Sequence, residues 1–144
     1  MSGVGANARS RLESMSVGVI DAGVAIAWIH GASRSRKALD RLYTACRDGS
    51  LSLVLSTVNL AEVLIHTAKY PHAAGVDPVA FLTASGLRIH PPDEAIARRV
   101  AKLETSLADG FAAATAQELG ARFHTTDGEL VRQLRRVRLA ITHY

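Results

Sequence analysis

The chain has 144 residues, 48% of them hydrophobic and 21% charged, which is typical of one globular domain with a full core. Its net charge of +4 favours a polyanionic partner. No apolar run approaches the ~20 residues of a membrane span, so we expect no membrane partner. The single cysteine, Cys46, excludes an internal disulfide and a thiolate metal cluster and is typical of a reducing cytoplasm.

The first half of the chain alternates short β-branched runs with helical patterns. Residues 1–14 are small, polar and without periodicity, so we expect a disordered leader before one domain over residues 15–144. The predicted elements that follow are a buried strand at Val17–Ile20, helices at Ala22–Ile29 and from Ser33 or Ser35 to Gly49, a strand at Leu51–Leu55 and a helix at Val58–Tyr70.

The second half continues the same alternation. Its predicted elements are a short helix at Val79–Ser85, a strand at Leu87–Ile89, a helix opened by Asp93, a helix around Asp109 that stops at Gly120, a strand at Arg122–Thr125, a helix at Asp127–Arg135 and an edge strand at Leu139–Thr142. Strands that alternate with helices predict an α/β fold with right-handed crossovers. We therefore expect a three-layer α/β/α sandwich around a central, mainly parallel sheet of four to five strands.

Four acidic residues fall at one end of this predicted sheet. Asp21 and Asp127 each directly follow a strand, and Glu62 lies one turn into the helix after the second strand. Asp109 opens a helix that is apolar almost all round and is therefore expected to be buried. Functional groups of such sheets gather beyond the carboxyl ends of the strands, so we expect the four carboxylates to meet among apolar neighbours. Read singly, the three aspartates could each be turn or helix-capping residues, whereas a mid-helix glutamate has no capping role.

Four carboxylates in one partly buried pocket have a chemical consequence. Like charges repel, so either the pKa values rise or a cation holds the site, and oxygen ligands suit Mg²⁺ or Mn²⁺. Such an ion can turn a bound water into a nucleophile and clamp phosphate oxygens. A basic surface around the pocket would attract nucleic acid. The residues alone therefore predict metal-dependent phosphodiester hydrolysis, without ranking RNA above DNA.

Four segments carry a resemblance to a known family: Val19–Val24, Asn59–Val63, Ser106–Ala116 and Leu119–Asp127. The most specific part is the pair of motifs Leu-Ala-Asp, which ends at Asp109, and Thr-Thr-Asp, which ends 18 residues later at Asp127. Together the segments resemble the PIN domain and, in size and spacing, the VapC-type ribonuclease toxins of bacterial toxin–antitoxin pairs. The resemblance implies a PIN-like fold, binding of Mg²⁺ or Mn²⁺ by the four acids, and endoribonuclease activity on RNA. It also implies a small cognate antitoxin that covers the site, and a homodimer.

The chain departs from the family pattern at one position of the predicted site. Members often carry Ser or Thr two residues after the first aspartate, where this chain has Gly23. A hydroxyl that could orient Asp21 or a metal-bound water is thus missing, and Thr126 is the candidate to supply a polar group instead. The candidates for contact with RNA phosphates, or otherwise a solvated basic face, are Arg34, Arg36, Lys37, Arg132, Arg135, Arg136 and Arg138.

Two other functions remain open. A non-catalytic PIN-like binding module is favoured by Gly23, because the missing hydroxyl would weaken catalysis. An aspartate-based phosphotransfer domain of similar sheet order is disfavoured, since the haloacid dehalogenase pattern has a second aspartate at the position of Gly23. Nucleotide-binding folds are excluded by the absence of G-x-x-x-x-G-K-[ST] and G-x-G-x-x-G runs.

Overall fold

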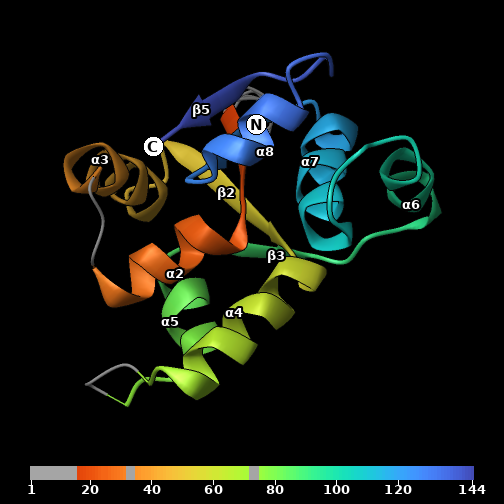
Figure 1. Ribbon diagram of the computed structural model, residues 1–144. Helices are drawn as coiled ribbons and strands as arrows, with labels where there is room; N and C mark the ends of the chain where they lie inside the picture. The colour runs from red at the N-terminus through yellow and green to blue at the C-terminus, as the bar shows by residue number, and fades with distance from the viewer. Residues whose placement is uncertain (1–15, 32–34, 72–74) are drawn as a thin grey trace, which may run out of the picture.

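The computed structural model describes residues 16–31, 35–71 and 75–144, which alternate between strands and helices (Figure 1). The strands are β1 (Ser16–Ile20), β2 (Leu51–Ser56), β3 (Arg88–His90), β4 (Arg122–Thr125) and β5 (Ile141–His143). The helices are α2 (Ala22–His30), α3 (Arg36–Arg47), α4 (Thr57–Lys69), α5 (Pro78–Ala84), α6 (Glu94–Val100), α7 (Leu107–Leu119) and α8 (Gly128–Gln133). The predicted leader over residues 1–14 and the basic residue Arg34 lie outside the described residues.

The five strands of the described ranges form one sheet in the order β3-β2-β1-β4-β5, with every neighbouring pair parallel. β1 lies at the centre, where Ile20 pairs with His124 of β4 and Val19 pairs with Val54 of β2. Because the strands are parallel, their carboxyl ends point to the same edge of the sheet. The predicted α/β fold with a parallel central sheet is confirmed.

Helices cover both faces of the sheet, which confirms the predicted three layers (Figure 1). On one face, α2, α3, α4 and α5 pack on a core that includes Ile20 and Leu55. On the other face, α7 and α8 pack against Val19, Val54 and Phe123, and α6 packs on α7. Neighbouring residues of β1 point to opposite faces that are both covered, so this central strand has no polar side chain from Val17 to Ile20.

The small side chains of α7 bring this helix close to the sheet. Four alanines of the helix are fully buried: Ala112, Ala113, Ala114 and Ala116. The helix begins after Ser106, whose Oγ accepts a hydrogen bond from the N–H of Asp109, and ends at Gly120 with φ 59°. The predicted helix around Asp109 that stops at Gly120 is confirmed.

Two C-terminal elements differ from their predicted bounds. α8 ends at Gln133 rather than Arg135, and β5 begins at Ile141 rather than Leu139. β5 pairs with β4 from Ile141 opposite Phe123 to His143 opposite Thr125, and directly before β5 the carbonyl oxygen of Ala140 accepts a hydrogen bond from the N–H of Phe123 at 2.8 Å. Among the helices of the described ranges, none is both long and apolar enough to cross a lipid bilayer.

Candidate active site

Side chains from four elements meet beyond the carboxyl ends of β1 and β4. A cavity of about 250 Å³ is lined by Asp21, Glu62, Asp109 and Asp127, together with Gly23 and Thr126. The two strand-end acids follow β1 and β4, the glutamate lies in the second turn of α4 and the remaining aspartate in the first turn of α7. The structure thus brings together all four acids that the sequence pattern singles out.

Asp21 is the buried member of this group, with 6% of its surface exposed. As the N-cap of α2, its Oδ1 accepts a hydrogen bond from the N–H of Val24 at 2.9 Å. Its Oδ2 accepts a hydrogen bond from the Thr125 hydroxyl at 2.5 Å. Burial raises the pKa of Asp21 to about 6, the two hydrogen bonds oppose the rise, and the negative charges of Asp109 and Asp127 add to it. Asp21 is therefore electrostatically coupled to two of the other acids.

Asp127 is exposed, which corrects the expectation that all four acids lie among apolar neighbours. As the N-cap of α8, its Oδ1 accepts hydrogen bonds from the N–H groups of Glu129 and Leu130 at 2.9 and 3.2 Å. Its own N–H donates to Thr125 Oγ1 at 3.0 Å. The residue lies two positions beyond β4, past the packed edge of the sheet, so its carboxylate reaches solvent. Capping and cavity-lining roles coincide here, as they do at Asp21.

A buried amide connects the two acids that are carried by helices. Asn59 Nδ2 donates to Glu62 Oε1 at 2.9 Å and to the carbonyl oxygen of Ala108 at 3.0 Å. Ala108 directly precedes Asp109, so this amide ties α4 to the first turn of α7. The Asn59 Oδ1 atom is buried and has no hydrogen-bond partner within the described part of the chain, which costs about 1–3 kcal/mol. An amide retained at that cost holds the two acid-bearing turns together.

Asp109 is half-buried at the open end of α7. Leu107, in the same turn, exposes 70% of its surface, and the continuously packed stretch of the helix lies further along. The expectation that the whole helix is buried is therefore wrong for its first turn and for Glu118 and Leu119 at its end. That opening presents the Asp109 carboxylate to the cavity, while the buried alanines anchor the rest of the helix on the sheet.

Two residues of this arrangement are missed by the sequence pattern, namely Thr125 and Asn59. Thr126 lines the cavity as a polar residue, but the hydroxyl that bonds to Asp21 belongs to Thr125. The sequence holds one signal for Thr125. Successive side chains of a strand point to opposite faces of the sheet, so Thr125 and its neighbour Thr126 are expected to point in different directions. Asn59 is flagged only by its polarity on a helix face that is otherwise apolar, since Ala108 lies 49 residues away in the chain.

The family model of the PIN domain matches residues 18–136, a span that holds all four acids. The chain belongs to the PIN domain family. The resemblance carried by the four sequence segments is therefore confirmed. No curated protein matches the chain by sequence.

Solved structures of toxin–antitoxin proteins share the fold of this PIN domain. A toxin–antitoxin complex from Klebsiella pneumoniae aligns with a TM-score of 0.64 and 18% identity, over 88% of this chain and 98% of its own. VapBC2 from Rickettsia felis, bound to a DNA fragment from the promoter, aligns with a TM-score of 0.65 and 16% identity, over 89% of this chain and 98% of its own. VapC20 from Mycobacterium tuberculosis, a sarcin–ricin loop cleaving toxin, aligns with a TM-score of 0.61 and 14% identity, over 80% of this chain and 93% of its own. At these identities the likeness shows a shared fold.

The acids of this PIN domain fit a divalent cation that keeps part of its water shell. Within the described ranges, no three Asp, Glu, His or Cys side chains stand close enough to hold one ion directly. Mg²⁺ commonly takes one or two carboxylates and several waters, and the cavity leaves room for such waters. Burial raises the pKa of Asp21 and the charges of Asp109 and Asp127 add to the rise, and a bound cation would offset the repulsion among these carboxylates.

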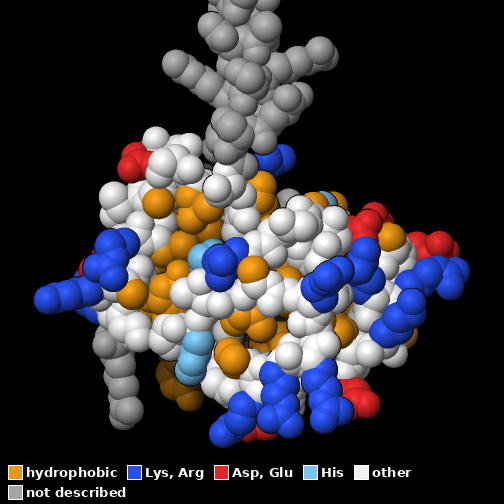
Figure 2. Space-filling view, turned by 90° about the horizontal axis from the view of Figure 1, so that it is seen from above, with side chains coloured by type: hydrophobic (Ala, Val, Ile, Leu, Met, Phe, Trp, Pro, Cys, Tyr) orange, Lys and Arg blue, Asp and Glu red, His pale blue; other side chains and the backbone are white. Residues whose placement is uncertain are grey.

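The basic residues predicted to contact RNA are spread over the surface of the PIN domain. Arg36 of α3 pairs with Asp40 at 3.6 Å, and Arg132 of α8 pairs with Glu129. The others that the structure describes are exposed: Lys37, Arg135, Arg136 and Arg138. Figure 2 shows Lys and Arg side chains along the margins of one face, with acidic side chains beside several of them. Their contact with RNA stays a prediction.

Proposed function

We propose that this PIN domain is a Mg²⁺- or Mn²⁺-dependent endoribonuclease and the toxin of a type II toxin–antitoxin pair. The observation that carries the proposal is the single cavity onto which Asp21, Glu62, Asp109 and Asp127 converge from separate elements. Further support comes from the family match and from the fold shared with toxins, one of them described as cleaving the sarcin–ricin loop. We place the activity in the cytoplasm, where the buried Cys46 would stay reduced.

The acids of the cavity would have two different roles in phosphodiester hydrolysis, namely binding the cation and positioning the attacking water. Asp21, oriented by two hydrogen bonds, and Asp109, on the anchored helix α7, would be the principal ligands of the cation. When bound, the cation supplies positive charge for a phosphate oxygen and lowers the pKa of a water. Glu62 and Asp127 would position the attacking water and take its proton. The water oxygen bonds to phosphorus as a P–O bond to one ribose breaks, and that ribose oxygen takes up a proton.

A cleavage assay tests the proposal. Labelled single-stranded RNA, and DNA of the same sequence, are incubated with Mg²⁺, with EDTA, and with the variant Asp109→Asn. We expect cleavage of RNA only with the metal, and a loss of about a hundredfold or more in the variant. Glu104→Gln removes the same charge from an exposed acid outside the cavity and should cleave as wild type does. Activity that survives both EDTA and Asp109→Asn would reject the metal mechanism.

A binding module without catalysis is the second candidate. It is favoured by Gly23 and by the finding that no three ligand side chains in the described ranges stand close enough for one ion. RNA that is retained in a gel-shift assay and stays intact with both Mg²⁺ and Mn²⁺ would support it. A phosphotransfer role stays disfavoured, because Gly23 stands where the haloacid dehalogenase pattern has its second aspartate.

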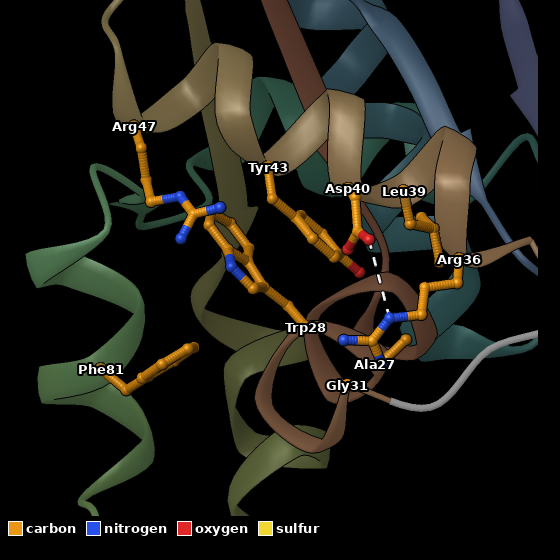
Figure 3. Close-up of a pocket in the computed structure, with 9 residues that line it drawn as sticks. All are labelled: Ala27, Trp28, Gly31, Arg36, Leu39, Asp40, Tyr43, Arg47 and Phe81. Atoms are coloured by element: carbon orange, nitrogen blue, oxygen red, sulfur yellow. Dashed lines mark ion pairs between the residues drawn. The ribbon is translucent and has the colours of Figure 1, made fainter.

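The antitoxin of the proposed pair has a candidate contact surface at the C-terminal end of α2. A pocket of about 190 Å³ lies between α2, α3 and α5 (Figure 3), and the side chains that shape it are Trp28, Tyr43, Phe81, Arg36, Asp40 and Arg47. The Trp28 and Tyr43 rings stack with centroids 4.4 Å apart, and Arg36 pairs with Asp40 at the rim. An aromatic wall beside guanidinium groups suits a segment that carries an apolar side chain next to an acid.

Fluorescence tests this contact, because Trp28 is the only tryptophan of the chain. Adding a candidate antitoxin should shift the emission and suppress RNA cleavage. Phe81→Ala should weaken both effects, while Leu119→Ala, at an exposed apolar position on α7, should leave them unchanged. Binding with unaltered affinity in Phe81→Ala and an unaltered emission would exclude the pocket as the contact.

We also propose a homodimer that buries the outer face of α4. This face exposes Leu64 and Ile65, and Tyr70 lies exposed directly after the helix ends; Ile65 and Tyr70 each show 61% of their surface to solvent. Exposed apolar side chains gathered on one helix are typical of a protein interface. Light scattering should give the mass of a dimer for wild type and of a monomer for Ile65→Glu. A monomeric wild type at micromolar concentration would reject this interface.

A further inference from the structure

Gly23 lies in the first turn of α2, two residues after Asp21, and its side-chain position points into the acid cavity. A Cβ atom built on Gly23 would lie 2.5 Å from Thr126 Oγ1 and 3.4 Å from Asp21 Oδ1. The first distance is shorter than real Cβ contacts. Gly23 does not have a positive φ, so its backbone would accept any residue. A side chain at position 23 would therefore compete with the Thr126 hydroxyl for the same space.

The Thr126 hydroxyl is available to a ligand. Its side chain is half-buried in the wall of the cavity, and no residue of the described ranges forms a hydrogen bond with it. The neighbouring Thr125 is fully buried and uses its hydroxyl on Asp21 and on the N–H of Asp127. The two threonines thus have different roles, because one faces protein atoms and the other faces the cavity.

We propose that Thr126 and Gly23 are a matched pair, in which Thr126 places a ligand-binding hydroxyl beside Asp21 in the space that a side chain at position 23 would occupy. This inference rests on the proposed function, since the ligand is a water of the bound cation or a phosphate oxygen. Both oxygens of Asp21 already accept hydrogen bonds from Val24 and Thr125. The Thr126 hydroxyl is therefore left to position the ligand that Asp21 holds. Thr126 acts as a positioning residue.

Because side chains at positions 23 and 126 compete for the same space, a hydroxyl from either position should be able to bind the ligand. Four variants test this: Thr126→Ala, Thr126→Ser, Gly23→Ser/Thr126→Ala and Gly23→Ala/Thr126→Ala. The last two have the same Cβ at position 23 and differ only in the hydroxyl. Each protein is assayed for RNA cleavage and, by calorimetry, for Mn²⁺ affinity. Melting temperatures in EDTA check that each variant is folded.

We expect Thr126→Ala and Gly23→Ala/Thr126→Ala to lose about tenfold or more in cleavage rate and in Mn²⁺ affinity. Thr126→Ser and Gly23→Ser/Thr126→Ala should stay within about threefold of wild type, because a hydroxyl returns to the same space. If the serine double variant is no better than the alanine double variant, the pairing is overturned. If a double variant does not fold, the comparison of Thr126→Ala with Thr126→Ser decides, and equal values in both readouts overturn the proposal.

The two readouts separate this inference from the proposed function. One outcome is that the proteins bind Mn²⁺ with the expected ranking of affinities but wild type leaves RNA intact. This outcome would reject the nuclease function and retain the matched pair. Wild type that cleaves RNA, with variants that do not differ in Mn²⁺ affinity or rate, would reject the matched pair alone.

Discussion

The two walls of the acid cavity hold their carboxylates by different means. On the strand-end wall, made by Asp21, Thr125 and Asp127, both aspartates are N-caps placed where β1 and β4 end. On the helix wall, made by Asn59, Glu62 and Asp109, neither acid is an N-cap, and one amide links their two helices. Acids of the strand-end wall therefore serve folding as well as the site. Acids of the helix wall cap no helix, so their substitution removes no cap and should act on activity and on the mutual repulsion of the carboxylates.

The largest expected effect lies on the strand-end wall and depends on pH. The pKa of Asp21 is about 6 in the fold against an ordinary 3.8, because burial, and then the neighbouring carboxylates, disfavour its charge. The folded state binds this proton more tightly than the unfolded chain does, so the stabilising effect is complete below pH 3.8 and is lost as the pH rises through 6. The loss amounts to about 3 kcal/mol. Urea unfolding in EDTA should show it in wild type relative to Asp21→Asn.

His124 titrates in the opposite sense and must be separated from this effect. Burial, and to a smaller extent the Arg122 charge, lowers the pKa of His124 to about 4 from an ordinary 6.5. Its contribution to stability is therefore complete above pH 6.5 and is lost as the pH falls through 4. Both proteins carry His124, so the difference between their profiles isolates Asp21. Parallel profiles for wild type and Asp21→Asn would contradict the prediction.

The next effect concerns the cation and the helix wall. Without metal, the charge of Asp109 repels that of Asp21, so Asp109→Asn should raise the melting temperature in EDTA. At a Mg²⁺ concentration about 100 times its Kd, wild type should gain about 2.7 kcal/mol, and Asp109→Asn clearly less. Thermal unfolding measures both shifts, with Glu104→Gln as the control that responds like wild type. Equal gains from Mg²⁺ in wild type and Asp109→Asn would exclude Asp109 as a ligand.

A smaller loss is expected at the amide that joins the helix wall. Asn59→Leu should slow RNA cleavage about tenfold, which is about 1.4 kcal/mol, because Glu62 and the first turn of α7 lose their common support. Thr67→Val is the matched control on α4, since the Thr67 hydroxyl bonds only to carbonyl groups of its own helix. The double variant Asn59→Leu/Glu62→Gln should be slower than Glu62→Gln by clearly less than tenfold, because the part of the loss that acts through Glu62 is already present. Losses that multiply in the double variant would show that Asn59 does not act through Glu62.

The smallest expected effect separates the two roles of Asp127. Asp127→Ala should lower the free energy of unfolding by about 1 kcal/mol, because α8 loses its N-cap. Asp127→Asn can still cap the helix, so its stability should remain near that of wild type while its RNA cleavage falls with the lost charge. Urea unfolding and the cleavage assay, run on both variants, test this. The dual role would be refuted by equal destabilisation in the two variants.

The local pattern of the sequence determines the fold and the places of the acids. Period-two and period-3.6 hydrophobicity reflects which faces of strands and helices are buried, and this pattern predicts the alternating strands and helices of the parallel sheet. Asp21 directly follows β1 and Asp127 lies two residues after β4, so a parallel sheet brings both to one edge. Helix ends are also local, which is why the bounds of α7 follow from Ser106 and Gly120.

The tertiary structure decides how the acids are held and how far each is exposed. Thr125 meets Asp21 across 104 residues, and Asn59 meets Ala108 across 49, through sheet register and helix packing that no local window contains. Burial of Asp21 and exposure of Asp127 depend on where each lies relative to the packed edge, although both follow strands and both cap helices. The sequence by itself determined which residues reach the cavity, because strand and helix ends are local. Only the packed fold decided their hydrogen-bond partners and charges, because contacts between distant segments and desolvation exist only once the layers have packed.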